Sequence, residues 1–139
     1  MKEKKIIITQ PTFLPYSGYF AALSICDEVI FLDDIQFSKR GWQQRNVIKT
    51  KNNKKFITVP VKSKNLFYQK ISEVQIDKSD AKWKKKILGL IQENYKNSKY
   101  FSNYYSKIKQ IIEKDRDSLI SLNLDLINLI LNFFEIKLN

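Results

Sequence analysis

Histidine is absent from the 139 residues of the chain, and Cys26 is its only cysteine. Without histidine the chain cannot contain a Ser-His-Asp or Cys-His relay, a histidine metal ligand or a His-x-Gly-His phosphate loop. One cysteine can form neither an internal disulfide nor a zinc site, so we expect a reducing compartment. Cys26 lies on the apolar stripe of a predicted helix, where we expect it to belong to the core.

Long apolar runs are also lacking. The run at residues 6–8 is too short for the apolar region of a signal peptide. The stretch at residues 119–134 is shorter than the ~20 residues that a membrane span needs, and it is interrupted by Asn123, Asp125, Asn128 and Asn132. We therefore expect a cytoplasmic chain with no membrane span, folded as a single α/β domain over residues 1–139.

Basic residues are abundant, but few of them are arginine. The formal net charge is +11, and only Arg40, Arg45 and Arg116 are arginines. The excess charge lies within residues 1–100, whereas residues 101–139 are neutral. Codon bias towards A and T accounts for part of the lysine content. The remaining interpretations are an anion-handling face or a polyanion-binding module. Nucleic acid is the less favoured partner, because the tyrosines near helix ends resemble packing residues more than a stacking platform.

The first third of the chain has the pattern of a parallel βαβ unit. Residues 4–9 and 28–32 are predicted strands, and residues 18–26 have helical periodicity. A βαβ unit is right-handed and its strands are parallel, so their carboxyl ends share one edge. The loops at 10–17 and 33–45 should therefore face one crevice, where open α/β sheets bind ligands.

The rest of the chain predicts a hairpin followed by helices. Strands are expected at 46–50, 54–60 and 71–76, helices at 79–95, 103–114 and 119–134, and the start of another strand at 135–138. The last helix is apolar on two seams and must be covered on two sides. The predicted fold class is α/β, an open sheet with an N-terminal parallel βαβ unit, an inserted β-hairpin and a C-terminal helical segment.

The segment at 10–20 is the first candidate site. Pro11 and Pro15 stiffen the loop, and Gly18 allows close approach of the backbone where a helix begins. A helix start after a rigid loop can bind an anion through free N–H groups. The alternative is an ordinary strand-to-helix connection. The candidate binding residues here are Gln10, Pro11, Phe13, Pro15, Gly18 and Tyr19.

The segment at 33–46 is the second candidate site. Its carboxylates can bind an amine or hydroxyl groups, act as a base or hold Mg²⁺, and its arginines can clamp phosphate or carboxylate. The alternative is that a carboxylate caps a turn and pairs with the arginines. The candidate catalytic residues are Asp33 and Asp34, and the candidate binding residues are Gln36, Lys39, Arg40, Trp42, Arg45 and Asn46.

Both segments resemble one known family. The pattern Gln10-Pro-x-Phe-x-Pro-x-x-Gly-Tyr-Phe and the run from Asp33 to Asn46 are similar to the WbqC-like protein family of bacterial polysaccharide clusters. The resemblance continues through residues 56–61, 83–86 and 100–101. It implies a transferase that moves an acyl or aminoacyl group, such as glycine, onto an amino sugar in O-antigen and related surface-polysaccharide biosynthesis. The implied small-molecule substrate is a nucleotide-sugar or an activated acyl donor, and no cofactor is specified.

The same resemblance leaves two other interpretations open. Family members continue with a further α/β portion, so this chain is expected to be a natural short form, a fragment or an inactive relative. It could then serve as a non-catalytic subunit, with a homo-oligomer or a partner subunit covering the seam of the last helix. A weaker likeness to the nucleotidyltransferase and class I synthetase superfold suggests adenylate chemistry only by analogy of fold.

Overall fold

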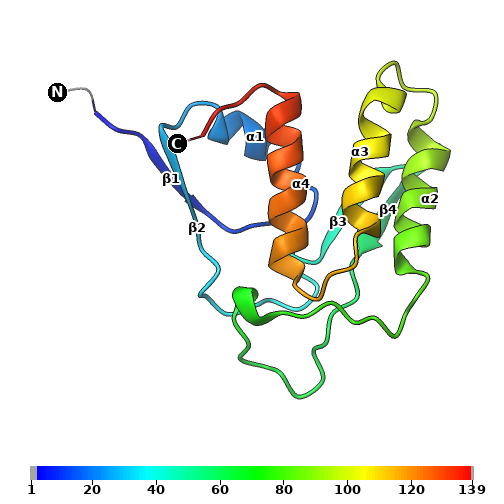
Figure 1. Cartoon of the computed structure of the whole chain (residues 1–139), viewed down its shortest axis with the longest axis horizontal. Coiled ribbons are helices and arrows are strands. Elements are labelled where there is room, and N and C mark those ends of the chain that lie inside the picture. The colour runs from blue at the N-terminus through cyan, green and yellow to red at the C-terminus, as the bar shows by residue number, and fades with distance from the viewer. Residues whose placement is uncertain (1–2, 139) are drawn as a thin grey trace.

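The computed structural model describes residues 3–138, and Figure 1 shows how their helices and strands are arranged. In chain order the elements are β1 (Ile6–Thr9), α1 (Ser17–Leu23), β2 (Glu28–Phe31), β3 (Arg45–Lys49), β4 (Lys54–Thr58), the 3₁₀ helix η1 (Ile71–Glu73), α2 (Trp83–Tyr95), α3 (Phe101–Glu113) and α4 (Leu119–Phe133). Helix α4 stands between the β1–β2–α1 side of the molecule and the α2–α3 side, as Figure 1 shows. No helix among these residues has the length and hydropathy needed to cross a bilayer.

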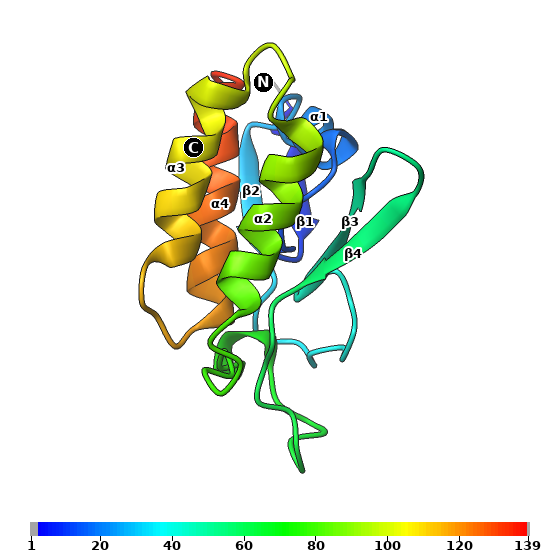
Figure 2. The same cartoon turned by 90° about the vertical axis from the view of Figure 1, so that its right-hand side faces the viewer.

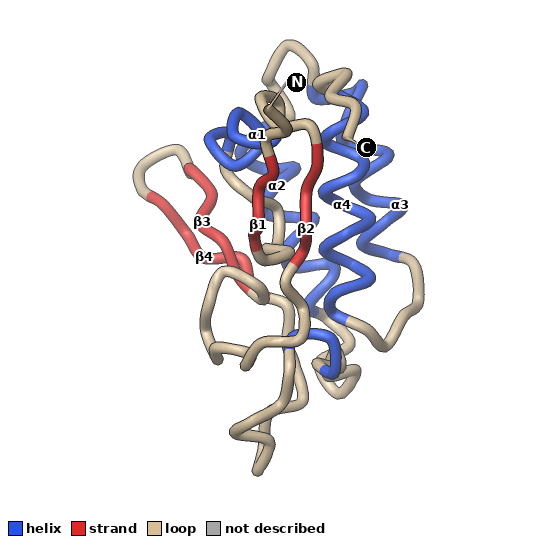
Figure 3. The backbone as a smooth tube through the Cα atoms, turned by 90° about the vertical axis from the view of Figure 1, so that its left-hand side faces the viewer, coloured by secondary structure: helices blue, strands red, loops and turns tan. Residues whose placement is uncertain are grey.

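The predicted βαβ unit is confirmed. Strands β1 and β2 pair in parallel, with Ile6 opposite Glu28 and Thr9 opposite Phe31. Their short β-branched sequences favour strands, and the prolines at 11 and 15 keep the intervening loop irregular until α1 begins. Because the strands run in the same direction, the loops that follow them leave from the same end of the sheet, which Figure 3 shows. The two candidate segments therefore start side by side.

The predicted hairpin is also present. Strands β3 and β4 pair antiparallel, from Arg45 opposite Thr58 to Lys49 opposite Lys54. The turn is closed by Thr50, whose hydroxyl donates to the Asn53 carbonyl at 2.7 Å. The hairpin forms a two-stranded sheet separate from β1–β2. The α/β fold class is thus confirmed, with the strands divided between two small sheets.

Helix α4 joins two hydrophobic clusters. Its side chains Leu119, Leu122 and Leu126 are buried in a cluster with α2, α3, β4 and η1. On another face Ile127 and Leu131 pack with α1 and with the inner side of β1–β2. Much of the two apolar seams expected from the sequence is therefore covered by other parts of the chain, whereas Phe134, at the end of the second seam, is 57% exposed. Exposed aliphatic side chains lie elsewhere: Ile6, Ile8 and Ile30 are on the outer face of β1–β2, and Ile25 and Leu66 are in loops.

The predicted strand at residues 71–76 is wrong. Residues 71–73 form η1, and only isolated bridges follow, one of them between Val61 and Ile76. The cause is that Ile71 and Val74 are both buried. Side chains three residues apart lie on one side of a 3₁₀ turn, whereas a strand would point them to opposite faces.

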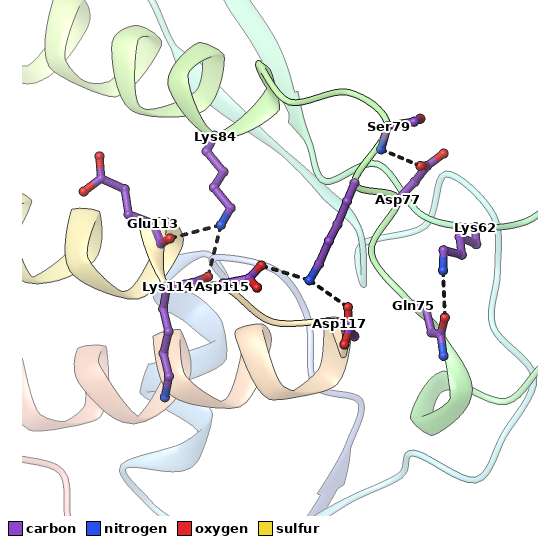
Figure 4. Close-up of polar contacts among 10 residues, drawn as sticks. Lys62, Gln75, Asp77, Ser79, Lys84, Glu113, Lys114, Asp115 and Asp117 are labelled. Carbon is purple, nitrogen blue, oxygen red and sulfur yellow. Dashed lines mark hydrogen bonds and ion pairs between the residues drawn. The ribbon is translucent and has the colours of Figure 1, made fainter.

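Lys84, at the start of α2, and Lys78, which precedes the helix, have partners of their own. Figure 4 shows Lys84, whose Nζ donates to the carbonyls of Glu113 and Lys114 at 3.0 and 3.1 Å and so caps the end of α3. Nearby, Lys78 lies 2.9 Å from Asp115 and 2.8 Å from Asp117. Hydrogen bonds to Asp117 and Asp115 raise the pKa of Lys78. Part of the lysine excess is therefore used to join helices.

No strand forms over residues 135–138, contrary to expectation, because α4 ends in a Schellman motif. The Ile136 N–H donates to the Leu131 carbonyl at 3.0 Å, and the Glu135 N–H donates to the Asn132 carbonyl at 3.2 Å. Glu135 adopts φ 54°, the left-handed conformation that this motif requires. The turn brings Ile136 back onto the cluster that contains Leu131.

We predict that Glu135→Gly raises the free energy of unfolding by about 0.5–1 kcal/mol, because glycine adopts positive φ without steric strain. Urea titration followed by circular dichroism measures the change. The control is Glu135→Ala, which removes the same charge from the helix end but retains a Cβ. Equal stabilisation by both substitutions would assign the effect to charge and contradict the backbone explanation.

Candidate binding pocket

The loop after β1 and the segment after β2 come together, as the parallel strands predicted. The Phe13 N–H donates to the Trp42 carbonyl at 2.9 Å. The Asn46 side-chain amide donates to the carbonyls of Phe13 and Leu14 at 3.1 and 2.7 Å. The Gln43 amide also donates to Gln10 Oε1. These contacts join residues about 30 positions apart in sequence into one structural unit.

A cavity of about 390 Å³ lies between the two segments. Its size is within the range of small-molecule sites. The side chains of its wall are aromatic, aliphatic, amide or hydroxyl groups, and none is charged. Trp42 and Tyr16 are 57% and 72% exposed, so their rings remain accessible at its mouth. The wall is formed by Thr12, Pro15, Tyr16, Tyr19, Trp42 and Asn46.

The shape of the first loop depends on one unusual backbone conformation. Leu14 has φ 44°, which is unfavourable for a residue with a bulky side chain. The adjacent side chain, Phe13, is fully buried, and the carbonyls of both residues accept hydrogen bonds from Asn46. Backbone strain of this kind persists only where surrounding contacts hold it in place. Asn46 is therefore a positioning residue for the loop.

The second segment turns tightly just before Trp42. The Gly41 N–H donates to the Ser38 carbonyl at 2.9 Å, and a Cβ at position 41 would lie 2.8 Å from that oxygen. Glycine is thus required by the close approach of the backbone. Arg40 has φ 62°, and its N–H donates to Gln44 Oε1 at 2.9 Å. This turn directs the chain back towards the loop after β1.

Helix α4 holds both segments through a residue that the sequence analysis did not select. Asn123 is fully buried, and its amide donates to the Pro11 carbonyl at 2.9 Å and to the Gln43 carbonyl at 2.8 Å. Pro11 belongs to one segment and Gln43 to the other. The sequence feature that could have identified Asn123 is a polar residue inside the wide apolar stripe of α4. A buried amide without hydrogen-bond partners would lower the stability of the fold, so such a residue indicates partners elsewhere in the chain.

Tyr19 connects the cavity to the end of β1. Its hydroxyl donates to the Gln10 carbonyl at 2.9 Å. Burial raises the pKa of Tyr19 to about 12, because the phenolate would lose solvation. At neutral pH the Tyr19 side chain is therefore uncharged, and its hydroxyl holds the Gln10 carbonyl in place.

The structure separates the candidate residues into two groups. Pro15, Tyr19, Trp42 and Asn46 line the cavity, and Gln10, Pro11 and Phe13 support its wall from behind. Gly18 borders a smaller adjoining cavity of about 200 Å³, where an added Cβ would meet the Tyr16 ring. Thr12 and Tyr16 are wall residues that the sequence analysis did not select.

The carboxylates and cations lie outside this wall. The Asp33 carbonyl accepts from the Ser72 N–H at 2.8 Å, and Asp34 is exposed. Gln36 donates to the Phe67 carbonyl at 2.9 Å and lines, with Lys39, a separate cavity of about 290 Å³. The Arg45 guanidinium lies 4.4 Å from the centre of the Phe56 ring, and Arg40 is exposed. The geometry thus joins the aromatic and amide residues in one wall and leaves the charged residues out of it.

Comparison with known protein families places the chain in one of them. The WbqC-like protein family model matches residues 10–139, and the chain belongs to this family. The chain is also 37% identical over 135 residues to "Uncharacterized protein Rv1507c" of Mycobacterium tuberculosis (strain ATCC 25618 / H37Rv). That alignment covers 96% of this chain and 58% of the relative. No solved structure matches.

We predict that Asn123→Ala lowers the free energy of unfolding by about 2–4 kcal/mol, because two buried carbonyls lose their donor and a small cavity remains. Urea titration measures the loss. Asn128→Ala is the matched control, since Asn128 lies on the same helix and is exposed. Equal losses in the two variants would show that helix propensity, rather than the buried amide, accounts for the change.

Proposed function

We propose that the chain binds an amino sugar, carried as a nucleotide-sugar, and takes part in transferring an acyl or aminoacyl group such as glycine to its amine. The setting would be the biosynthesis of O-antigen or a related surface polysaccharide. Membership of the WbqC-like family supports this proposal. The observation that carries it is the uncharged, aromatic-walled cavity between the two loops.

The cavity suits a sugar ring better than it suits a small anion. Trp42 and Tyr16 offer flat apolar faces, and the apolar C–H face of a sugar can pack against such rings. The Thr12 hydroxyl provides a polar contact in the same wall. Asn46 uses its amide to hold the loop, so its contribution to binding is the shape of the wall.

The charged residues of the segment at 33–46 would act on parts of the substrates that extend beyond the cavity. In the transfer step the amine nitrogen attacks the acyl carbonyl carbon, and the bond from that carbon to its leaving group breaks. The amine proton passes to a carboxylate, for which Asp34 or Asp33 is the proposed acceptor. Lys39, Arg40 and Arg45 would bind the phosphate or the anionic leaving group.

We predict that a UDP-linked amino sugar quenches the fluorescence of Trp42. Trp42→Ala should weaken binding at least about ten-fold, because the aromatic face against which the sugar packs is lost. Trp83 is 5% exposed, so Trp42 is the tryptophan that a ligand in the cavity would reach. Isothermal titration calorimetry measures the affinity of the variant.

Tyr68→Ala is the control for this test, because Tyr68 is 87% exposed and lies outside the cavity wall. It should bind like the unaltered chain. A Trp42→Ala chain that binds with unchanged affinity would refute the assignment of the sugar to this cavity.

We further predict that Asp34→Asn reduces transfer at least about 100-fold while the fold survives, because the amide cannot accept the amine proton. The assay incubates the chain with glycyl adenylate and the UDP-linked amino sugar and detects the acylated product by mass spectrometry. Asp33→Asn in parallel determines which of the two carboxylates is used, and the exposed Glu93→Gln is the control. Full activity in both aspartate variants would eliminate the proposed acid–base role.

A further inference from the structure

Six lysines gather where the β3–β4 hairpin meets the end of α2. Four lie on the hairpin, and two lie in the connection between α2 and α3. The hairpin is attached by the Lys49 N–H, which donates to the Tyr95 hydroxyl at 3.0 Å, and by the Lys51 N–H, which donates to Asn94 Oδ1 at 3.2 Å. Figure 2 shows the hairpin beside α2. We call these residues the lysine cluster: Lys49, Lys51, Lys54, Lys55, Lys96 and Lys99.

The positive charge of the lysine cluster is not neutralised within the chain. Within residues 3–138 none of the six ammonium groups lies within 4.0 Å of a carboxylate oxygen. Residues 49–55 contain no acidic residue, and Glu93 is the one carboxylate in residues 90–100. Lys49 is directly opposite Lys54 across the hairpin, an arrangement that destabilises a strand pair. An anionic partner would remove that repulsion.

An apolar groove lies next to the lysine cluster. Its volume is about 280 Å³, and it runs between the second half of α2 and the first half of α3. Tyr95 belongs to both features, because its side chain lines the groove while its hydroxyl holds the hairpin. Tyr100 is 54% exposed, and Lys99 Nζ lies 5.1 Å from the centre of its ring. The wall includes Ile91, Tyr95, Lys99, Tyr100, Tyr104 and Ile108.

We propose that this end of the molecule docks on an anionic lipid bilayer. The lysine cluster would contact the headgroup phosphates, Tyr100 and Tyr104 would lie at the interface, and the groove would take a segment of an acyl chain. Clustered lysines attract anionic leaflets, and tyrosine rings favour the boundary between water and hydrocarbon. The residues involved are different from those that line the 390 Å³ cavity, so this proposal is independent of the proposed function.

A bilayer fits the combination of features better than a nucleic acid does. A nucleic acid would use the charge of the lysine cluster, but base recognition needs accessible stacking faces and polar groups aimed at base edges. Here Phe101 and Tyr105 stack on each other with centroids 4.6 Å apart, and Tyr105 donates its hydroxyl to the Leu88 carbonyl. The exposed rings Tyr100 and Tyr104 border the apolar groove, and a base stacked on them would leave that groove without a matching partner. Only a partner that is both anionic and apolar uses the lysine cluster and the groove together.

Vesicle co-sedimentation of the full chain tests the proposal. We expect binding to phosphatidylcholine vesicles that contain about one third phosphatidylglycerol, no binding to phosphatidylcholine alone, and weaker binding as salt rises above about 0.15 M. Lys49→Ser combined with Lys54→Ser should weaken binding about thirty-fold, because these lysines lie opposite each other on one face of the hairpin and each lysine near an anionic surface contributes about five-fold. Tyr100→Ser should also weaken binding, and it should do so at unchanged net charge.

The controls keep charge and exposure matched. Lys64→Ser combined with Lys85→Ser removes the same charge from exposed positions outside the lysine cluster, and Phe67→Ser removes an exposed aromatic ring in another loop. Both should bind like the unaltered chain. The proposal is overturned if the controls lose as much binding as the test variants or if anionic vesicles are not bound. It is also overturned if inorganic phosphate displaces the chain from the anionic vesicles. A further contrary result would be a single-stranded oligonucleotide that binds as tightly as the vesicles do, with Tyr100→Ser weakening neither interaction.

Discussion

The buried amide of Asn123 is the contact on which the candidate pocket depends. It donates to one carbonyl in each of the two loops that form the cavity, and it belongs to the helix that joins both hydrophobic clusters. Neither loop has regular secondary structure, so their backbone groups need partners from outside. With α4 packed in place, the loops are held at a fixed separation, and the space between them is preserved.

The polar chemistry of the molecule is distributed over distinct regions. The cavity wall is uncharged and largely aromatic, the carboxylates of the second segment are outside it, and six lysines that have no carboxylate partner among residues 3–138 lie on the hairpin and the α2–α3 connection. Other lysines are structural, as Lys84 at the end of α3 and Lys78 beside two aspartates demonstrate. The net charge of +11 therefore combines helix-joining contacts with a localised basic surface.

Prediction from the sequence succeeded where a local pattern is sufficient. The βαβ unit, the hairpin and the last helix have strong periodicity or turn signals, and each is present close to the expected bounds. Parallel strand geometry also predicted that the segments at 10–17 and 33–45 converge, which the Phe13–Trp42 and Asn46–Leu14 contacts confirm. The pattern at 71–76 misled because alternation over so few residues does not distinguish a strand from a 3₁₀ turn.

By itself, the order of residues determined the fold class, the two loops that meet and the aromatic residues available to line a pocket, because these follow from periodicity, chirality and proline geometry. Tertiary packing alone decided which of the candidate side chains share a wall. Asp33 and Trp42 are nine residues apart, yet one backbone is bound to Ser72 and the other to Phe13. Such a division depends on long-range hydrogen bonds, including those of Asn123, and no local pattern encodes their partners.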